Sequence, residues 1–388
     1  MKTWLILALT GAIWSMTSVA GAQEMTTVEL DAPEAEDPYR LDWLVTPSTK
    51  YNDDAGFIYG IKTELIRHDP NERPYDWSFQ LRLSHSTRNR HDHLITLDAP
   101  GLLDKDNRLR FEGRFMQIND ALFFGVGNDS QRTDSDRAHQ FRLTEPSARV
   151  SIQRNILGGD FFVGGGLSFR QSIIDARPGS ILATLQPNGV EGGHNTQALL
   201  FMGHDSRDHE IVPHSGHMTE LYIKASIGPL ASTHSYAGIG FNHQSFFELA
   251  PWMVLAQRVQ AEDLWGDVPF FVMDRMGGIF ERRGLGGSFT QRGFEEGRFI
   301  GRTKALSNTE LRFYMPRLFS DRMCIGFGPL MDVSTVVDAD ASGRFWEDLN
   351  VSGGGEITIG WKRTFIIRFD YAQSREGGLF YIQSRHLF

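Results

Sequence analysis

The sequence has little of three features that would assign it to a familiar class of protein. Cys324 is its only cysteine, so no disulfide can form within the chain. Beyond the first 22 residues it has no apolar run of about 18 residues, the length that a transmembrane helix needs. Its formal net charge is −9, which gives no reason to expect a nucleic-acid partner. A disulfide scaffold and a helical membrane protein are therefore excluded.

The amino terminus carries a targeting signal. Lys2 precedes the apolar stretch WLILALTGAIW, and the tripeptide AGA supplies a cleavage site of small residues. This pattern predicts a signal peptide over residues 1–22, and the apolar stretch is too short to favour the alternative of a membrane anchor. Residues 23–50 are acidic, contain proline and lack periodicity, so we expect a short periplasmic tail there.

From residue 55 onward, apolar and polar residues alternate, as they do in strands with one apolar face. In NRLRFEGRFMQI, Leu109, Phe111 and Phe115 share one face, and arginines and a glutamate occupy the other. DWSFQLRLSH and TFIIRFDYA show the same pattern. Comparable segments recur at roughly 107–118, 138–156, 160–173, 196–205, 217–228, 234–246, 251–262, 304–315, 322–334, 355–362, 363–373 and 378–388.

Two architectures fit this alternation: a soluble all-β protein, or a transmembrane β-barrel with a polar lumen. Strands of about 10 residues, the secretory signal and the aromatic-rich apolar faces favour the barrel. A closed barrel also satisfies every backbone polar group in lipid. We therefore predict a single antiparallel barrel of about 16 strands over residues 51–388, in the bacterial outer membrane. Its first strand, near 55–67, would meet the last, near 378–388, to close the wall.

Several motifs, in order, resemble the bacterial surface antigen family, the BamA/TamA superfamily of outer-membrane assembly and secretion barrels. They are LFFGVGN (122–128), GHDSRDHEIVPHSG (203–216), MGGIFERRGLGGSFTQRGFEEGRF (276–299) and NTELRF (308–313). The terminal Phe388 resembles the signal that the outer-membrane assembly machinery recognises on such barrels. The resemblance covers nearly the whole mature chain.

The resemblance implies a role for the tripeptide Arg292-Gly293-Phe294. In the family this tip of a long extracellular loop folds back into the lumen, where its arginine pairs with carboxylates of the wall. Gly293 would supply the positive φ angle that a sharp tip needs. The alternative is a solvated, charged surface loop.

Alternation identifies partners for this arginine independently of the resemblance. Glu310, Asp332 and Asp370 each lie on the strand face opposite to the apolar residues, so they point inward. A fork-shaped guanidinium suits two carboxylates, so we expect Arg292 to act as a latch on these residues.

A cluster of histidines raises the question of a metal. His204, His209, His214 and His217 lie close together, but their spacing matches none of the usual zinc sites, so no metal or other cofactor is predicted. The stretch resembles the family's strand-end turn. There, Asp205 and Arg207, next to Asp208, would order the turn through charge-assisted hydrogen bonds.

The function that these features favour is insertion of membrane proteins or lipids, assisted by a weak seam between the first and last strands. Assembly and secretion members of the family carry POTRA modules, for which residues 23–50 are too short, so the resemblance alone does not carry their activity over. The alternatives are a passive or gated pore whose lumenal Arg108, Arg110 and Arg114 favour anions, and a barrel that only displays loops or binds partners. No nucleophile–base–acid set is apparent, so an enzyme is not expected. Expected partners are outer-membrane lipids and a separate periplasmic protein.

Overall fold

The structure is a computed structural model. It describes residues 41–53, 55–68, 75–101, 106–133, 135–210, 212–228, 231–316, 323–337, 348–361, 365–383 and 386–388. The predicted signal peptide and most of the predicted tail lie outside these ranges. None of the helices within them has the length and hydropathy that a membrane crossing requires.

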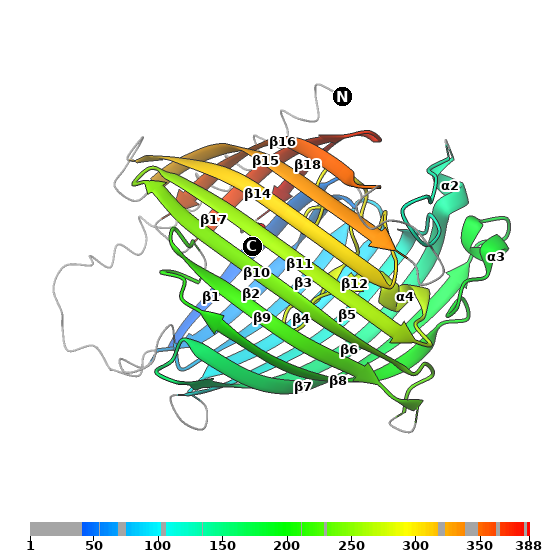
Figure 1. Ribbon diagram of the computed structural model, residues 1–388, viewed down its shortest axis with the longest axis horizontal. Helices are drawn as coiled ribbons and strands as arrows, with labels where there is room; N and C mark the ends of the chain where they lie inside the picture. Colours follow the sequence, from blue (N-terminus) through cyan, green and yellow to red (C-terminus); the bar gives the residue numbers. More distant parts are fainter. Residues whose placement is uncertain are drawn as a thin grey trace. The chain divides into compact units, whose positions relative to one another are not determined.

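Sixteen antiparallel strands close into one barrel (Figure 1), which confirms the predicted fold class and strand number. Each strand pairs with the next along the chain, except that β11 pairs directly with β14, and β18 pairs with β1. The strands are β1 Leu41–Asn52, β2 Gly56–Arg67, β3 Trp77–Ser86, β4 Arg90–Pro100, β5 Asn107–Leu122, β6 Gln140–Ile156, β7 Phe161–Ala176, β8 Gly193–Asp205, β9 Gly216–Ser226, β10 Tyr236–Ala250, β11 Met253–Gly266, β14 Thr303–Pro316, β15 Met323–Val337, β16 Asn350–Trp361, β17 Phe365–Ser374 and β18 Gly377–Gln383.

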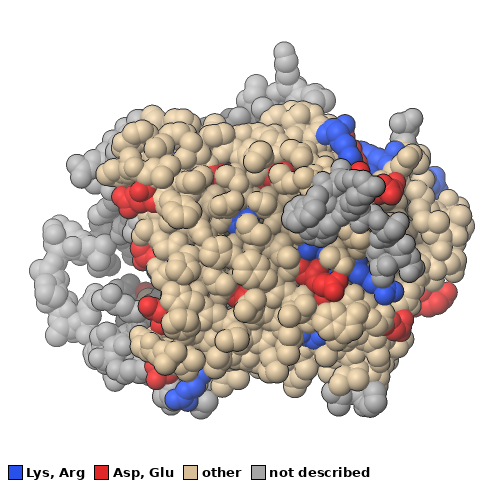
Figure 2. All heavy atoms as spheres, viewed as in Figure 1, with Lys and Arg blue, Asp and Glu red and all other residues tan. Residues whose placement is uncertain are grey.

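The alternation seen in the sequence separates the two faces of the wall. Phe111 and Phe115 of β5 are exposed on the outer face, and so is Tyr371 of β17. On β17, the alternate residues Arg368 and Asp370 are fully buried. Figure 2 shows one side of the wall, on which charged side chains are sparse between the two ends. This is the arrangement expected where the outer face meets acyl chains.

The barrel begins earlier than the sequence predicted. Strand β1 occupies Leu41–Asn52, inside the predicted tail 23–50, and the predicted first strand at 55–67 is β2. Apolar–polar alternation did not predict β1 because this strand has no regular apolar face. A backbone ladder with β2 along its full length holds it in place. Trp43 and Leu44, which are neighbours and therefore point to opposite faces, are both exposed.

The last strand also ends earlier than predicted. Strand β18 stops at Gln383, and residues 386–388 are not in a strand. Phe388 instead packs against the buried residues Phe246, Val254 and Ala256 of β10 and β11. Its ring also lies 5.2 Å from the guanidinium of Arg258. Phe388 therefore lies against the inner face of β10 and β11 and not in the backbone ladder.

The connections between strands include three short helices and one hairpin. Helix α2 (Asp136–His139) joins β5 to β6, and α3 (Ile181–Leu185) joins β7 to β8. The connection from β11 to β14, residues 267–302, contains α4 (Phe270–Met273) and the hairpin of β12 (Arg275–Met276) and β13 (Arg282–Arg283). We call it the β11–β14 loop.

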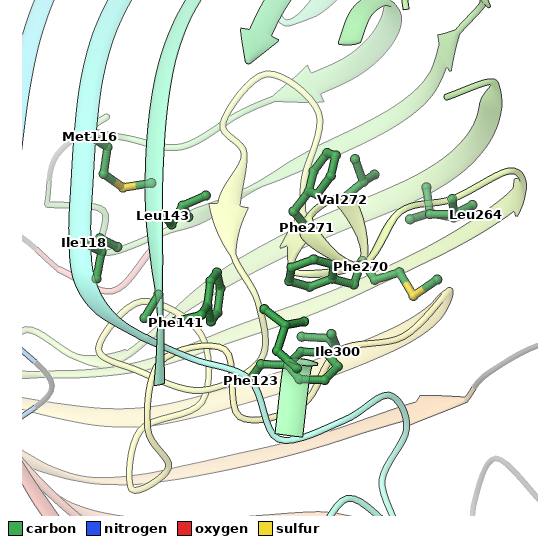
Figure 3. Packing of buried hydrophobic residues seen from close by; sticks show 14 of the residues in the cluster. Met116, Ile118, Phe123, Phe141, Leu143, Leu264, Phe270, Phe271, Val272 and Ile300 are labelled. Atoms are coloured by element: carbon green, nitrogen blue, oxygen red, sulfur yellow. The ribbon is translucent and has the colours of Figure 1, made fainter. Parts of the chain in front are cut away.

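Helix α4 anchors the start of this loop in an apolar cluster (Figure 3). Phe270 lies edge-on to Phe123 and Phe141, with ring centroids 5.2 and 5.8 Å apart. All four residues of α4 are buried in the cluster, together with Ile300 from the end of the loop. Both ends of the loop are therefore packed against residues of β5, β6, β10 and β11.

Candidate functional site

The guanidinium of Arg292 is fully buried and held by two carboxylates. Its Nε and Nη2 donate to the two oxygens of Asp332, both at 2.8 Å, and its Nη1 donates to Glu310 Oε1 at 2.7 Å. The backbone N–H of Arg292 also donates to Asp332 Oδ2, at 2.9 Å. The structure thus brings together the arginine and two of its three predicted partners, in the bidentate geometry that gives strong, directional bonds.

Both carboxylates have a second partner. Arg312 donates to Glu310 Oε2 from Nε at 2.9 Å and from Nη2 at 2.6 Å. Asn308 Nδ2 donates to Asp332 Oδ1 at 2.7 Å. Arg292, Glu310 and Asp332 are therefore parts of one buried polar network, in which each bond supports its neighbours.

The third predicted partner, Asp370, lies farther away. Its Oδ2 is 3.7 Å from Nη1 of Arg292, within ion-pair distance but beyond a hydrogen bond. Arg368, on the same strand, places its Nε 2.9 Å from that oxygen. Asp370 therefore contributes charge to the site, while its nearer partner is a residue of its own strand.

Gly293 adopts the predicted left-handed conformation, with φ +85°. Its N–H donates to Tyr381 Oη of β18 at 3.1 Å, and its carbonyl accepts from Ser374 Oγ of β17 at 2.6 Å. A Cβ at this position would lie 3.1 Å from Ser352 Cβ and 3.3 Å from the backbone of Ala372. Both the turn and the close approach therefore require glycine.

Phe294 completes the tip. It is buried, its ring centroid lies 5.0 Å from that of Phe299, and its carbonyl accepts from Tyr381 Oη at 3.3 Å. The neighbouring Gln291 donates from Nε2 to the carbonyl of Asn350 at 2.6 Å. The buried hydrophobic cluster around Phe294 contains Met276, Leu285, Phe299, Leu306 and Val336. Residues 291–294, which we call the tip, thus contact all five strands from β14 to β18.

A second ionic cluster, which the sequence did not predict, surrounds Glu281 earlier in the loop. Its carboxylate is hydrogen-bonded to Arg170 of β7 and lies 3.3 Å from Arg149 of β6. Arg275 and Lys224 lie 3.8 and 4.0 Å away. Burial alone would raise the pKa of Glu281, but Arg170, Arg149 and the other cations outweigh it and hold that pKa well below its ordinary value.

Strand β9 supplies further contacts to the loop. Glu220 Oε1 accepts from the backbone of Ile279 at 2.6 Å, and Tyr222 Oη accepts from that of Gly277 at 3.1 Å. Tyr222 in turn donates to Glu262 Oε2 at 2.8 Å. A signal for these residues exists in the sequence: in HMTELYIKAS, polar residues alternate with Leu221 and its outward-facing neighbours.

The strand-end turn after β8 contains the expected bonds. Arg207 donates to Asp205 from Nε at 2.8 Å and from Nη2 at 2.7 Å. Asp208 Oδ1 accepts from the backbone of His214 at 2.8 Å. The nearby histidines have other neighbours: the ring of His214 stacks on Tyr314, with centroids 4.9 Å apart.

The seam between the first and last strands is short. Among the described residues, β1 and β18 pair only at Tyr51–Ile382 and Asn52–Tyr381. One side-chain bond supports them, from the N–H of Phe380 to Asp53 Oδ2 at 2.8 Å. For comparison, β1 forms twelve such pairs with β2 and β10 forms fourteen with β11.

Comparisons with known proteins agree with this geometry. BamA from Haemophilus ducreyi lacking POTRA domains 1–3 has a TM-score of 0.58 and 13% identity, over 89% of this chain and 70% of that one. CdiB from Escherichia coli has a TM-score of 0.59 and 10% identity, over 90% of this chain and 63% of that one. CdiB from Acinetobacter baumannii has a TM-score of 0.51 and 12% identity, over 89% of this chain and 65% of that one.

Similarity at this low identity shows the fold, and this chain spans less than two thirds of either CdiB. No curated protein sequence matches. The Omp85 superfamily domain, however, matches residues 75–376, most of the described barrel. The family resemblance read from the motifs is thereby confirmed: this chain belongs to the Omp85 superfamily of outer-membrane β-barrels.

Proposed function

We propose that this barrel assists the insertion or translocation of proteins or lipids at the outer membrane. We further propose that its wall opens at the β1–β18 seam, where the two strands part. The supporting observation is the contrast, among the described residues, between two paired positions at the seam and twelve between β1 and β2. A backbone hydrogen bond contributes about 0.5–1.5 kcal/mol net, so parting so short a ladder costs far less than parting any other pair of neighbours.

A parted seam would offer strand edges to a client. The register leaves Leu41–Lys50 of β1 paired with β2 but, among the described residues, not aligned with β18. Edges of this kind accept an additional strand by backbone hydrogen bonding. A client hairpin could therefore extend the wall before it leaves into the bilayer.

The β11–β14 loop would act in the lumen as a latch that keeps one side of the seam in place. Its tip is bonded to β14, β15, β17 and β18, so these strands would move as one unit. Strand β1 has no such bond from the tip among the described residues. When the seam opens, β1 would therefore be the strand that moves away from β18.

Partners follow from this proposal. Outer-membrane lipids would surround the exposed apolar face, the assembly machinery would act during biogenesis, and a separate periplasmic protein could deliver clients. No chemical step is required, so the role would be a non-catalytic one.

The alternative of an anion-selective pore has less support. Arg108 donates to Asp98 at 2.8 and 2.5 Å, and Arg114 donates to Asp92 at 2.6 Å. Arg110 donates to the amide of Gln153 at 2.9 Å. Arg110 Nε also lies 3.6 Å from Asp98 Oδ1, so each of the three arginines expected to attract anions has a carboxylate beside it.

A reversible lock on the seam tests the proposal. In a Cys324→Ser background, Tyr51→Cys and Ile382→Cys would place a disulfide across one seam pair. The matched control, Phe241→Cys with Ala261→Cys, places one between β10 and β11.

The readout is the outer-membrane protein and lipid profile after depletion of the native chain. We expect the seam-locked barrel to restore the profile only after reduction, and the control to restore it in both states. Full restoration by the oxidised seam variant, or an unchanged profile on depletion, would contradict the proposal.

A further inference from the structure

Three histidines converge on the outer face of β3 and β4, apart from the loop and the seam. His85 of β3 lies directly opposite His91 of β4 in the register, and His93 follows two residues later on the same face. The ring centroids of His85 and His91 are 4.0 Å apart. Each residue presents a ring nitrogen, and these three nitrogens all lie within 4.8 Å of one another.

We propose that His85, His91 and His93 form a binding site for a divalent transition-metal ion. Three imidazoles are a donor set that suits Zn²⁺, Cu²⁺ or Ni²⁺, whereas Mg²⁺ and Ca²⁺ prefer oxygen. Zinc binds imidazole nitrogen at about 2.0–2.1 Å, which places three such nitrogens about 3.3 Å apart in a tetrahedral site. Binding would therefore require the rings to turn so that nitrogens now within 4.8 Å of one another approach to that value.

The surroundings support binding. His93 Nδ1 is buried and, among the described residues, has no hydrogen-bond partner. His85 is exposed and the other two are half-buried. The group lies at the end of the wall, beside the turn that joins β3 to β4, so an ion can reach it from that end. Three protein ligands leave a coordination position for water.

The scaffold beneath the histidines is rigid. They sit on two directly paired strands next to a tight turn, in which the N–H of Asn89 donates to the carbonyl of Ser86 at 3.0 Å. The N–H of Arg90 donates to Ser86 Oγ at 3.1 Å. Ligands on paired strands need little reorganisation to bind.

A second outward-facing histidine group provides an internal contrast. His204, His217 and His243 also lie near one another, with the rings of His204 and His217 4.9 Å apart. Two of the three have an engaged ring nitrogen: His243 Nδ1 is hydrogen-bonded to Thr219 Oγ1 at 2.8 Å, and His217 Nδ1 to Ser206 Oγ at 3.2 Å. His204 Nδ1 has no hydrogen-bond partner among the described residues. Among the described residues, only the first group converges.

Metal titration of the purified full chain, without a histidine tag and in detergent micelles, tests the site. We expect one equivalent of Zn²⁺ to compete with a chromophoric chelator. His91→Ala removes one of the three ligands and should weaken that affinity by more than about tenfold. Loss of a residue that only hydrogen-bonds to a metal ligand already costs about tenfold or more. Cu²⁺ should show nitrogen hyperfine structure in its electron paramagnetic resonance spectrum.

His243→Ala is the matched control and should keep the wild-type affinity, and His85→Gln provides a second disrupting variant if His91→Ala does not fold. The proposal fails if the wild-type chain binds no stoichiometric Zn²⁺. It also fails if His91→Ala and His85→Gln retain wild-type affinity, or if His243→Ala weakens binding as much as they do.

Discussion

The two edges of β18 are held in different ways. Toward β17 it forms seven residue pairs, and its Tyr381 hydroxyl bonds to the tip of the β11–β14 loop. Toward β1 it forms two pairs among the described residues. One strand therefore joins a part of the wall that the tip contacts to the shortest ladder among the described residues. Neighbouring strands of one barrel are thus held by different means: β17 and β18 by a ladder and the loop tip, β18 and β1 by a short ladder.

Removal of the arginine at the tip should have the largest effect on this contrast. Arg292→Ala leaves Glu310 and Asp332 buried without their shared cation, which typically costs about 3–5 kcal/mol. We expect a lower thermal unfolding temperature and loss of heat-modifiable mobility on gels.

A partly exposed arginine on the other side of the barrel gives the control. Arg82 pairs with Asp92 at 2.8 Å where both side chains are partly exposed, so Arg82→Ala should cost no more than about 1 kcal/mol. Equal stability of the Arg292→Ala and wild-type barrels would disprove the bracing role of the tip.

The next largest effect concerns Glu281 and depends on pH. The folded-state pKa of Glu281 is depressed below its ordinary value of about 4.5. The stability that the ionised Glu281 gives to the fold is therefore complete above pH 4.5 and is lost as the pH falls toward the folded-state pKa. Glu281→Gln leaves buried arginines less well paired and should cost about 1–3 kcal/mol at neutral pH.

Thermal unfolding measured from pH 7 to pH 3 checks this. The destabilisation by Glu281→Gln should shrink as the pH falls. A Glu112→Gln control, at an exposed position, should show the same unfolding temperature as the wild-type chain at every pH. A pH-independent difference would show that the carboxylate charge is not what stabilises the loop.

A smaller effect should follow from Gly293→Ala. The left-handed conformation costs an alanine about 1–2 kcal/mol, and the added Cβ must also displace Ser352 and Ala372. Gly179 has a similar φ of +78° with nothing within 4 Å of an added Cβ, so Gly179→Ala isolates the backbone term. Chemical denaturation should rank Gly293→Ala as the more destabilised; the reverse order would argue that the tip is loosely packed.

The smallest global effect should come from the seam itself. Asp53→Ala removes the acceptor of the Phe380 N–H, but β1 keeps its ladder with β2, so the change in stability should be below about 1 kcal/mol. Hydrogen exchange at the Phe380 amide should nevertheless accelerate, while Phe369 of β17 exchanges as before. Unchanged exchange at Phe380 would show that the seam does not depend on this bond.

Alternation in the sequence predicted what depends on local pattern. It placed Glu310 and Asp332 on the inner face, and the family motif identified Arg292 as their partner; the structure contains both contacts. It missed β1 because a strand paired along its whole length needs no regular apolar face. It could not rank Asp370 below the other carboxylates, since that depends on the nearby guanidinium of Arg368.

Long-range convergence was also out of reach. Glu281 meets Arg170 and Arg149 only because the loop is bonded to distant strands. His85 and His91 are six positions apart in sequence and become direct neighbours only through the β3–β4 register. The short pattern His-x-His at 91–93 was the one available hint of that group.

The position of Phe388 has a consequence for the order of events in biogenesis. In the finished barrel its ring packs against Phe246 and lies within 5.3 Å of the guanidinium of Arg312. The family resemblance predicts that assembly machinery reads this terminal aromatic, and we expect the ring to be more accessible before these contacts form. Folding thus partly covers the predicted signal, and we expect a mature barrel to compete poorly with newly made chains for the same receptor.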